Sequence, residues 1–280
     1  MKILVTGASG FIGKNFLEST QHKELFTLST SNITSQKIYK HFIGDLNDLS
    51  FFKSVLDEKF DVIIHLAWIG LPQRNSSVNL QNADLYHSIF QLISGSRETK
   101  NVFIGSCLEY GKLMGKVSEI SQGIEIDDFG RTKLELCKEA QQFELSYDWL
   151  RLFYTFGPYQ HPNSLIQSIQ RDLFQGNRIS LNSPSLSHDF IYIKDVVELI
   201  DLLCASESSN SIYNVGSGVP TSTGQVANTI SNLLGRKPIF EEEQQLALTA
   251  NISKAVTDTG WHPKFTIEQG IKATLSWGTQ

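Results

Sequence analysis

The sequence is poor in cysteine, proline and methionine. Its 280 residues include 3 cysteines, 7 prolines and 2 methionines. The cysteines, Cys107, Cys137 and Cys204, are too few and too widely spaced for a disulfide framework or a zinc site. Scattered cysteines of this kind are typical small buried residues of a cytosolic protein. We therefore expect neither disulfides nor a bound metal.

Positive charge and long apolar runs are scarce as well. Lysine and arginine total 24 against 29 acidic residues, which gives a net charge of −5. This balance indicates no broad basic surface for nucleic acid or an anionic membrane. No apolar stretch is long enough to span a bilayer, and the one after Met1 is too short for a signal peptide. We expect a cytoplasmic protein that binds phosphate through local groups such as a helix N-terminus.

Short apolar runs alternate with longer amphipathic stretches in the first half of the chain. Their continuous Val, Ile, Leu and Phe content is typical of strands buried on both faces. Repeated strand–helix alternation predicts an α/β fold with a doubly wound parallel Rossmann sheet. The expected strands are 2–6, 25–29, 60–67, 101–106 and 148–154, and the expected helices are 12–20, 49–59 and 131–145.

The alternation loosens after Gly157-Pro158. This change predicts a dinucleotide-binding domain over 1–158, joined by segments near 189–218, and a smaller, interleaved C-terminal substrate lobe over 159–188 and 219–280. Further strands are expected at 190–193 and 211–215, a helix, loop and helix over 221–263, and a closing helix over 266–277.

A glycine-rich segment, Gly7-Ala8-Ser9-Gly10-Phe11-Ile12-Gly13, follows the first strand and opens the first helix. Glycines at such a turn allow the backbone to approach a pyrophosphate, and the helix N-terminus then faces the phosphates. The position directly after a strand favours a dinucleotide site over a purely structural turn.

The Gly-x-x-Gly-x-x-Gly spacing resembles the short-chain dehydrogenase/reductase family, and later segments extend the resemblance along essentially the whole chain. Gly105-Ser106-Cys107-Leu108-Glu109-Tyr110-Gly111 resembles the strand end that carries the active-site Ser or Thr. His188-Asp189-Phe190 and Tyr213-Asn214-Val215-Gly216 resemble segments of the sugar-nucleotide epimerase/dehydratase branch. The resemblance implies an extended family member whose substrate is a nucleotide-diphosphate sugar.

The resemblance also assigns dinucleotide contacts beyond the glycine loop. Asp45 is expected at the adenine, and Leu66-Ala67 and Lys133 at the nicotinamide ribose. Together with the end of the second strand, the expected cofactor-binding residues are Gly7, Ser9, Gly10, Phe11, Ile12, Gly13, Ser29, Ser31, Asp45, Leu46, Leu66, Ala67 and Lys133.

The end of the second strand bears on the choice between NAD and NADP. It reads Leu28-Ser29-Thr30-Ser31-Asn32, without the acidic residue that usually binds the ribose hydroxyls of NAD. Hydroxyls and an amide tolerate a 2′-phosphate, and Lys14 adds positive charge after the third glycine. The sequence therefore favours NADP(H) over NAD.

The catalytic set implied by the resemblance is a Ser or Thr with a Tyr-x-x-x-Lys pair on a helix. Ser106 and Lys133 match it, but the tyrosine position holds Phe129. A phenyl ring cannot transfer a proton, so little or no redox turnover is expected. An introduced substitution and a natural replacement both explain Phe129; the intact remainder of the site favours an introduced, shape-conserving substitution.

The reaction is narrowed by Cys107 and Leu108, which occupy the places of the Asp-Glu pair that dehydratases of this branch carry. Dehydration is therefore disfavoured. The end of the second strand has no acidic residue, and the chain is compact. Both features favour NADPH-dependent reduction of the C4 keto group of a nucleotide-linked 4-keto-6-deoxyhexose. Two alternatives stay open: an NAD-dependent nucleotide-sugar 4-epimerase, and a catalytically dead dinucleotide-binding sensor or scaffold.

Substrate contacts and assembly are also implied by the resemblance. His188 stands where the branch has a diphosphate-binding arginine, and an imidazolium there would bind phosphate. A homodimer is expected through the helix of Lys133 and a helix near 85–94. The expected substrate-binding residues are Glu109, Tyr154, Ser164, Leu165, Arg178 and His188.

Overall fold

The computed structural model describes residues 1–71, 76–95, 98–206, 210–241 and 243–277, which divide into two compact units. The first unit holds residues 1–111, 122–151 and 197–213, and the second holds 112–121, 152–196 and the chain from 214 onward. The chain therefore passes between the units several times, with 112–121 and 152–158 in the second unit rather than the first.

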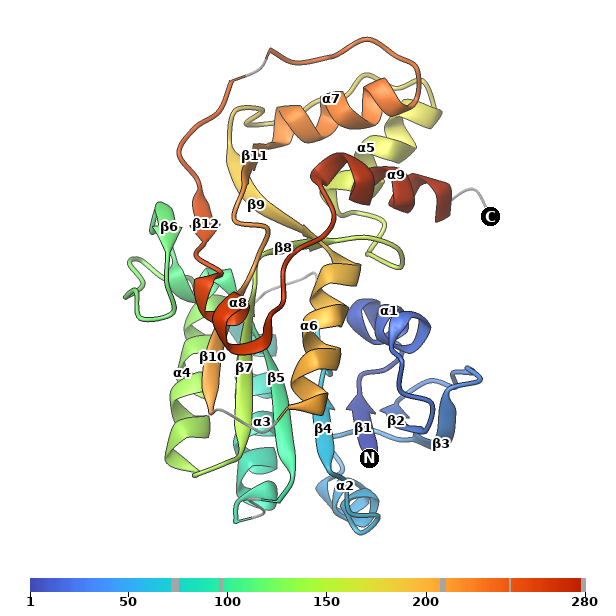
Figure 1. Cartoon of the computed structure of the whole chain (residues 1–280), viewed down its shortest axis with the longest axis vertical. Helices are drawn as coiled ribbons and strands as arrows, with labels where there is room; N and C mark the ends of the chain where they lie inside the picture. Colours follow the sequence, from blue (N-terminus) through green and yellow to red (C-terminus); the bar gives the residue numbers. More distant parts are fainter. Residues whose placement is uncertain (72–75, 96–97, 207–209, 242, 278–280) are drawn as a thin grey trace. The chain divides into compact units, whose positions relative to one another are not determined.

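A seven-stranded sheet has the order β10-β7-β5-β4-β1-β2-β3 (Figure 1). Strand β1 pairs in parallel with β2 on one side and β4 on the other, and β3 and β5 extend the sheet in parallel. The strand order therefore reverses beside β1, where open α/β sheets bind their ligands. The predicted doubly wound sheet is confirmed. Its strands are β1 (Ile3–Thr6), β2 (Leu25–Ser29), β3 (Ile38–Ile43), β4 (Val62–His65), β5 (Lys100–Ser106), β7 (Tyr147–Leu152) and β10 (Ser211–Val215).

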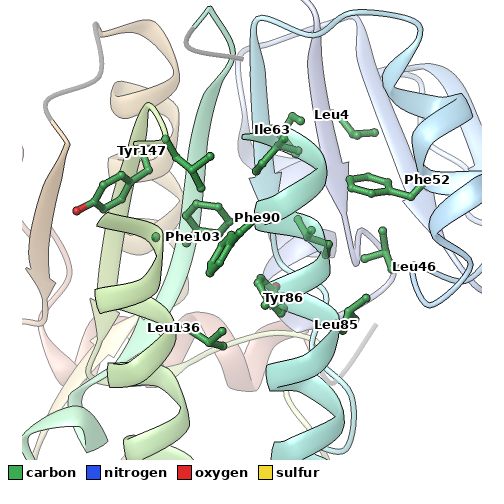
Figure 2. Packing of buried hydrophobic residues seen from close by; sticks show 14 of the residues in the cluster. Leu4, Leu46, Phe52, Ile63, Leu85, Tyr86, Phe90, Phe103, Leu136 and Tyr147 are labelled. Carbon is green, nitrogen blue, oxygen red and sulfur yellow. The ribbon is translucent and has the colours of Figure 1, made fainter. Parts of the chain in front are cut away.

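The main core of the first unit lies between the sheet and helices α2 (Leu49–Leu56), α3 (Ser76–Ile93) and α4 (Asp128–Gln142). Figure 2 shows Leu4, Ile63 and Phe103 of the strands among apolar side chains of these helices. Apolar side chains on this face of the sheet are therefore buried, as the sequence predicted. Helix α1 (Phe11–Ser19) and the short helix η1 (Cys107–Tyr110) complete the elements that surround the sheet's carboxyl edge.

Two expected boundaries are wrong. The run 148–154 is not one strand, because Phe153 donates its backbone N–H to Val215 O at 2.9 Å and separates β7 from β8 (Tyr154–Phe156). The run 60–67 forms a strand only over Val62–His65, and its last residues turn into the loop that follows.

The second unit contains a three-stranded sheet, β11-β9-β8, and a parallel pair, β12-β6. Strand β9 pairs in parallel with β8 and antiparallel with β11. The strands not yet bounded are β6 (Gly115–Val117), β9 (Ser187–Tyr192), β11 (Pro220–Ser222) and β12 (Leu248–Ala250). The helices are α5 (Leu165–Phe174), α7 (Thr223–Leu233), α8 (Ser253–Thr259) and α9 (Ile267–Trp277), while α6 (Ile193–Ala205) begins here and ends in the first unit.

A buried carboxylate holds three segments of the second unit together. Asp189 accepts hydrogen bonds from Ser217 N and Oγ, both at 2.7 Å, from Gly218 N at 3.0 Å and from Ala250 N at 2.9 Å. Its side chain lies in β9, and these donors lie after β10 and in β12. The carboxylate therefore substitutes for a ladder that these short segments do not form among themselves.

We expect Asp189→Ala to lower the free energy of unfolding by roughly 3–5 kcal/mol, because buried N–H donors lose a charged acceptor together. Urea denaturation would measure the loss. Asp172→Ala is the control: Asp172 is half-buried on the same unit's helix α5, and its replacement should cost less than about 1 kcal/mol. An equal loss of unfolding free energy in the two variants would contradict the proposed role of Asp189 in holding these segments together.

Candidate active site

The glycine loop joins three strands of the first unit. Gly7 has φ +66° and donates its N–H to Leu28 O at 2.9 Å, which ties the loop to β2. A Cβ on Gly7 would lie 2.6 Å from Ala67 N and 2.8 Å from Leu66 C, both after β4. Only glycine allows this turn and this approach. The structure therefore brings Gly7, Leu66 and Ala67 together, as the sequence predicted for a dinucleotide site.

The N-terminus of α1 is open. Its N-cap is Gly10, which provides no side-chain cap for the amides of Phe11, Ile12 and Gly13. Gly10 N donates back to Gly7 O at 2.9 Å and so fixes the turn around Ser9. Uncapped helix amides are suited to an anion. The loop thus fits the pyrophosphate of a dinucleotide.

The end of β2 is a hydroxyl-rich turn. Ser29 is buried and donates its hydroxyl to Ser31 O at 2.7 Å, while Ser31 is exposed. The His41 ring lies between Thr27 Oγ1 at 2.8 Å and Ser31 O at 3.2 Å. Residues 28–32, all within the described part of the chain, include no acidic side chain.

Asp45 and Leu46 follow β3. The Asp45 carboxylate is exposed and accepts from Asn47 N at 3.0 Å and Asn47 Nδ2 at 2.8 Å, which shapes a tight turn. Leu46 is buried in the core, so its side chain faces the protein. Only main-chain groups of Leu46 are therefore suited to a ligand.

The loop after β4 is clamped from α3. Tyr86 donates its hydroxyl to Ala67 O at 2.6 Å. Asn82 bonds to Ile69 through both its oxygen, at 2.9 Å, and its amide nitrogen, at 3.0 Å. These bonds fix the backbone on both sides of Trp68 and therefore the position of its indole ring.

Lys133 meets that indole. Its Nζ lies 3.3 Å from the centroid of the Trp68 ring and donates to Ile104 O at 2.8 Å. Burial lowers the pKa of Lys133 from 10.5 to about 7, and the Glu109 carboxylate acts in the opposite sense. A lysine with this pKa exchanges its proton at physiological pH, as catalytic lysines do.

Phe129 occupies the tyrosine position without a polar substitute. The ring is buried on α4, one turn before Lys133, and packs edge-on against Trp68 at 5.7 Å between centroids. Asp127 caps α4 by accepting from Gly130 N at 2.7 Å. The start of helix α4 is therefore well formed, and Phe129 places a phenyl ring without a hydroxyl there.

Ser106 ends β5 and caps η1. Its Oγ accepts from Leu108 N at 3.1 Å, and its own N–H donates to Glu109 Oε1 at 2.9 Å, which completes a capping box. The Ile104 carbonyl that binds Lys133 lies two residues before it on the same strand. The structure thus places the predicted residues Ser106 and Lys133 at one strand end.

The expectation that Glu109 borders the sugar is wrong for its side chain. Glu109 is 1% exposed and bonds to Trp149 Nε1 at 3.0 Å and Arg151 Nε at 2.6 Å. Together with Ser106 N, these donors bind the Glu109 carboxylate in the protein interior. The sequence does not reveal this internal role of Glu109, because both partners lie about 40 positions away on β7. Its place beside Ser106 instead suggested a contact with the substrate.

We expect Lys133→Met to stabilise the free protein below neutral pH. Since the pKa of Lys133 falls from 10.5 to about 7 on folding, the unfolded chain binds this proton more tightly. The resulting penalty is complete below pH 7 and disappears as the pH rises to 10.5. Lys133→Met should therefore gain roughly 2–4 kcal/mol at pH 6 and almost nothing near pH 10.

Urea unfolding at several pH values would measure this difference. Lys138→Met, an exposed lysine of the same helix, should change the unfolding free energy by less than about 0.5 kcal/mol throughout. A loss of stability in Lys133→Met at pH 6 would contradict the burial of a charged amine.

In the second unit, His188 stacks on Tyr154, with ring centroids 3.9 Å apart. Burial lowers the pKa of His188, so the neutral imidazole dominates at pH 7. The expected cationic contact of His188 with a diphosphate is therefore not favoured. The two half-buried rings instead stack on each other at the starts of β9 and β8.

The other expected substrate residues also lie in the second unit. Ser164 is the N-cap residue of α5, and its Oγ is buried without a hydrogen-bond partner among the described residues. Leu165 begins the helix and is half-buried, and Arg178 is exposed. Arg178 is thus accessible to a ligand, whereas Ser164 Oγ is enclosed by protein.

Three residues of the site were missed by the sequence: Trp68, Asn82 and Tyr86. Aromatic and amide residues at helical spacing are usually explained by packing, and their contacts depend on a loop that only the fold positions. Several apolar side chains of α3 and α4, among them Leu85, Ile89, Leu136, Cys137 and Ala140, face the core, whereas Leu80 of α3 is exposed.

In the described part of the chain, no helix has the length and apolar character required of a membrane span, and no cluster of His, Cys, Asp or Glu is placed to hold a metal ion. The three cysteines all lie in the described part of the chain, where they are buried and form no disulfide.

Comparison with known proteins gives consistent matches along the chain. The sequence profile of the NAD dependent epimerase/dehydratase family matches residues 3–216. An uncharacterised UDP-glucose epimerase of Bacillus subtilis, YtcB, is 29% identical over 310 aligned positions, covering 99% of this chain and 98% of the relative.

Two solved structures have the same fold. One is dTDP-glucose 4,6-dehydratase from Bacillus anthracis in complex with NAD, with a TM-score of 0.87, 23% identity, and coverage of 100% of this chain and 96% of that one. The other is a Tyr-to-Phe mutant of UDP-glucuronic acid 4-epimerase from Bacillus cereus with UDP-4-deoxy-4-fluoro-glucuronic acid and NAD. It has a TM-score of 0.85 and 21% identity, covering 100% of this chain and 99% of that one.

Proposed function

Because the chain belongs to the NAD dependent epimerase/dehydratase family, we propose that it binds NAD and a nucleoside-diphosphate hexose, at a site built for epimerisation at C4 of the sugar. The observation that carries the proposal is the open helix N-terminus beside the Gly7 turn, in the same unit as Ser106 and Lys133. When bound, NAD supplies the hydride acceptor and donor for the sugar carbon.

The chain's own residues have distinct parts in this proposal. The amides at the start of α1 bind the pyrophosphate. Lys133 Nζ would bind the ribose hydroxyls, and Ser106 Oγ would hydrogen-bond the sugar oxygen. Phe129 shapes the site but cannot move a proton, so turnover in the chain as it stands is low.

Epimerisation has better support than the NADPH-dependent 4-keto reduction expected from the sequence. YtcB is named as an epimerase, and the solved epimerase holds NAD. Dehydration, the reaction of the other solved relative, would lack its acidic pair, since Cys107 and Leu108 stand there.

The choice of NAD over NADP is supported by the two solved relatives, both of which hold NAD. Lys37 and Lys40 are not candidates for a 2′-phosphate contact. They lie toward the start of β2, where Leu25 N donates to Lys37 O and Phe26 pairs with Lys40, whereas a 2′-phosphate would bind at the carboxyl end of β2.

The proposal is tested by denaturing the purified chain and identifying the nucleotide it releases. NAD is expected; NADP would contradict the cofactor assignment. Calorimetric titration with UDP- and dTDP-hexoses then tests the substrate class. A chain that binds neither NAD nor any nucleotide sugar would overturn the proposal.

A second candidate function is binding without turnover, as a sensor or scaffold. The observation that favours it is the apolar contact of Phe129 with Trp68, which leaves position 129 without a hydroxyl. It predicts that NAD binds but that no sugar is converted after tyrosine is restored. The proposed homodimer, whose test is the sedimentation mass, is compatible with either function.

A further inference from the structure

A buried ion pair lies directly behind the proposed catalytic residues. The Glu109 and Arg151 side chains are 0% and 5% exposed, and Arg151 Nε contacts Glu109 Oε2 at 2.6 Å. Arg151 NH1 also donates to the Tyr110 hydroxyl at 2.8 Å. Buried ion pairs rarely stabilise a fold more than apolar side chains of the same size would. Stability alone therefore does not explain why Glu109 and Arg151 lie at this place.

The carboxylate is bonded to the strand end that carries Ser106. Glu109 Oε1 accepts from Ser106 N at 2.9 Å and from Trp149 Nε1 at 3.0 Å. Gly105 makes this approach possible, because a Cβ there would lie 2.4 Å from Glu109 Oε1 and 2.2 Å from Trp149 Nε1. Glu109 thus fixes the backbone at Ser106 from the interior.

The same carboxylate is brought close to the helix of Lys133. Helix α4 packs on η1 through Gly130, where a Cβ would lie 2.1 Å from Leu108 O. Lys133 Nζ in turn binds Ile104 O, two residues before Ser106 on β5. Lys133 and Glu109 therefore dock on neighbouring main-chain groups of one strand end.

We propose that Glu109 is a positioning residue of the catalytic site: it orients Ser106 and supplies the buried negative charge that acts on the Lys133 amine. This proposal rests on the proposed function for its meaning, but its main test does not. Two other described residues, Trp68 and Tyr86, contact Lys133 through their rings, and burial raises the pKa of Tyr86, which is therefore neutral.

Charged groups farther from Lys133 also affect its protonation. Arg151 is the partner of Glu109, and on α4 itself Asp128, Arg131, Glu135 and Lys138 are exposed and screened by solvent. Removal of Glu109 leaves Arg151 as an unpaired cation and takes away the carboxylate that favours the charged lysine.

The test is the titration of Lys133 in the free protein. Its side-chain ¹³Cε resonance is followed against pH and assigned by its absence in Lys133→Met. We expect a midpoint near pH 7 in the parent and a midpoint lower by about 1 unit or more in Glu109→Gln. An unchanged midpoint would overturn the proposal.

The matched control is Asp148→Asn. Asp148 forms a second buried ion pair on β7, with Lys100 at 2.8 Å, and both side chains are less than one-tenth exposed. Its loss disturbs the same strand without touching Ser106 or Lys133. The midpoint of Lys133 should stay within about 0.3 units; an equal shift in this control would show a general effect of strand damage and sink the proposal.

Because Glu109→Gln leaves a buried guanidinium, a second variant, Glu109→Gln/Arg151→Met, removes both charges. It should fold more readily and still show a midpoint below that of the parent. In a Phe129→Tyr background, the alkaline limb of the kcat–pH profile should move to lower pH with Glu109→Gln. Absence of all turnover would count against the proposed function alone, because the titration of Lys133 needs no substrate.

Discussion

Phe129→Tyr is expected to raise the rate of nucleotide-sugar 4-epimerisation by roughly 10²–10⁴-fold, the usual contribution of a positioned proton-transfer group. Phe129 lies one turn before Lys133 on the buried face of α4. Its ring is already held against Trp68, so the substitution adds one oxygen to a side chain that is in place. The nearby Lys133 charge lowers the pKa of a phenol and readies it for proton transfer.

The measurement is conversion between UDP-glucose and UDP-galactose, and between the corresponding uronic acids, without added cofactor. Phe143→Tyr, at the C-terminal end of the same helix, adds the same oxygen outside the site and should produce no gain. Adding Lys133→Met to Phe129→Tyr should abolish the gain. If Phe129→Tyr binds NAD and sugar but converts none, the sensor function replaces the enzyme.

Much of the fold could be predicted from the sequence because strands buried on two faces have a continuous apolar pattern. Strands 25–29 and 211–215 have the expected bounds. Strand β3 was missed, since it lies at the sheet edge and its residues, such as Tyr39 and Ile43, are largely exposed. Strands β6, β11 and β12 have three residues each, and their pairing depends on partners distant in sequence.

The site divides in the same way. The resemblance assigned Ser106, Lys133 and the glycine loop through short local motifs, and the structure places all of them in one unit. Glu109 was misassigned, because its partners Trp149 and Arg151 belong to another strand. Trp68 was missed since nothing in its neighbourhood distinguishes a site aromatic from a core aromatic. Chemistry carried by local motifs is therefore accessible from sequence, whereas the support of that chemistry requires the fold.

The turn at Gly7 allows a second large effect to be predicted, on folding and cofactor binding together. Gly7→Ala should lower the free energy of unfolding by roughly 3–5 kcal/mol. About 1–2 kcal/mol arises because an L-residue disfavours a φ of +66°. The remainder arises because the new Cβ would stand 2.6 Å from Ala67 N and 2.7 Å from Ala67 Cα, where backbone must move.

Gly95→Ala separates the two contributions. Gly95 has φ +84°, and nothing lies within 4 Å of its added Cβ, so this variant bears only the conformational cost of about 1–2 kcal/mol. Thermal unfolding measures both variants, and NAD titration below the transition should show at least about tenfold weaker binding for Gly7→Ala alone. Equal stability losses would mean that the loop yields without strain against β4. The close contact between the first turn and the strand that leads to Trp68 would then not be what holds the dinucleotide site in shape.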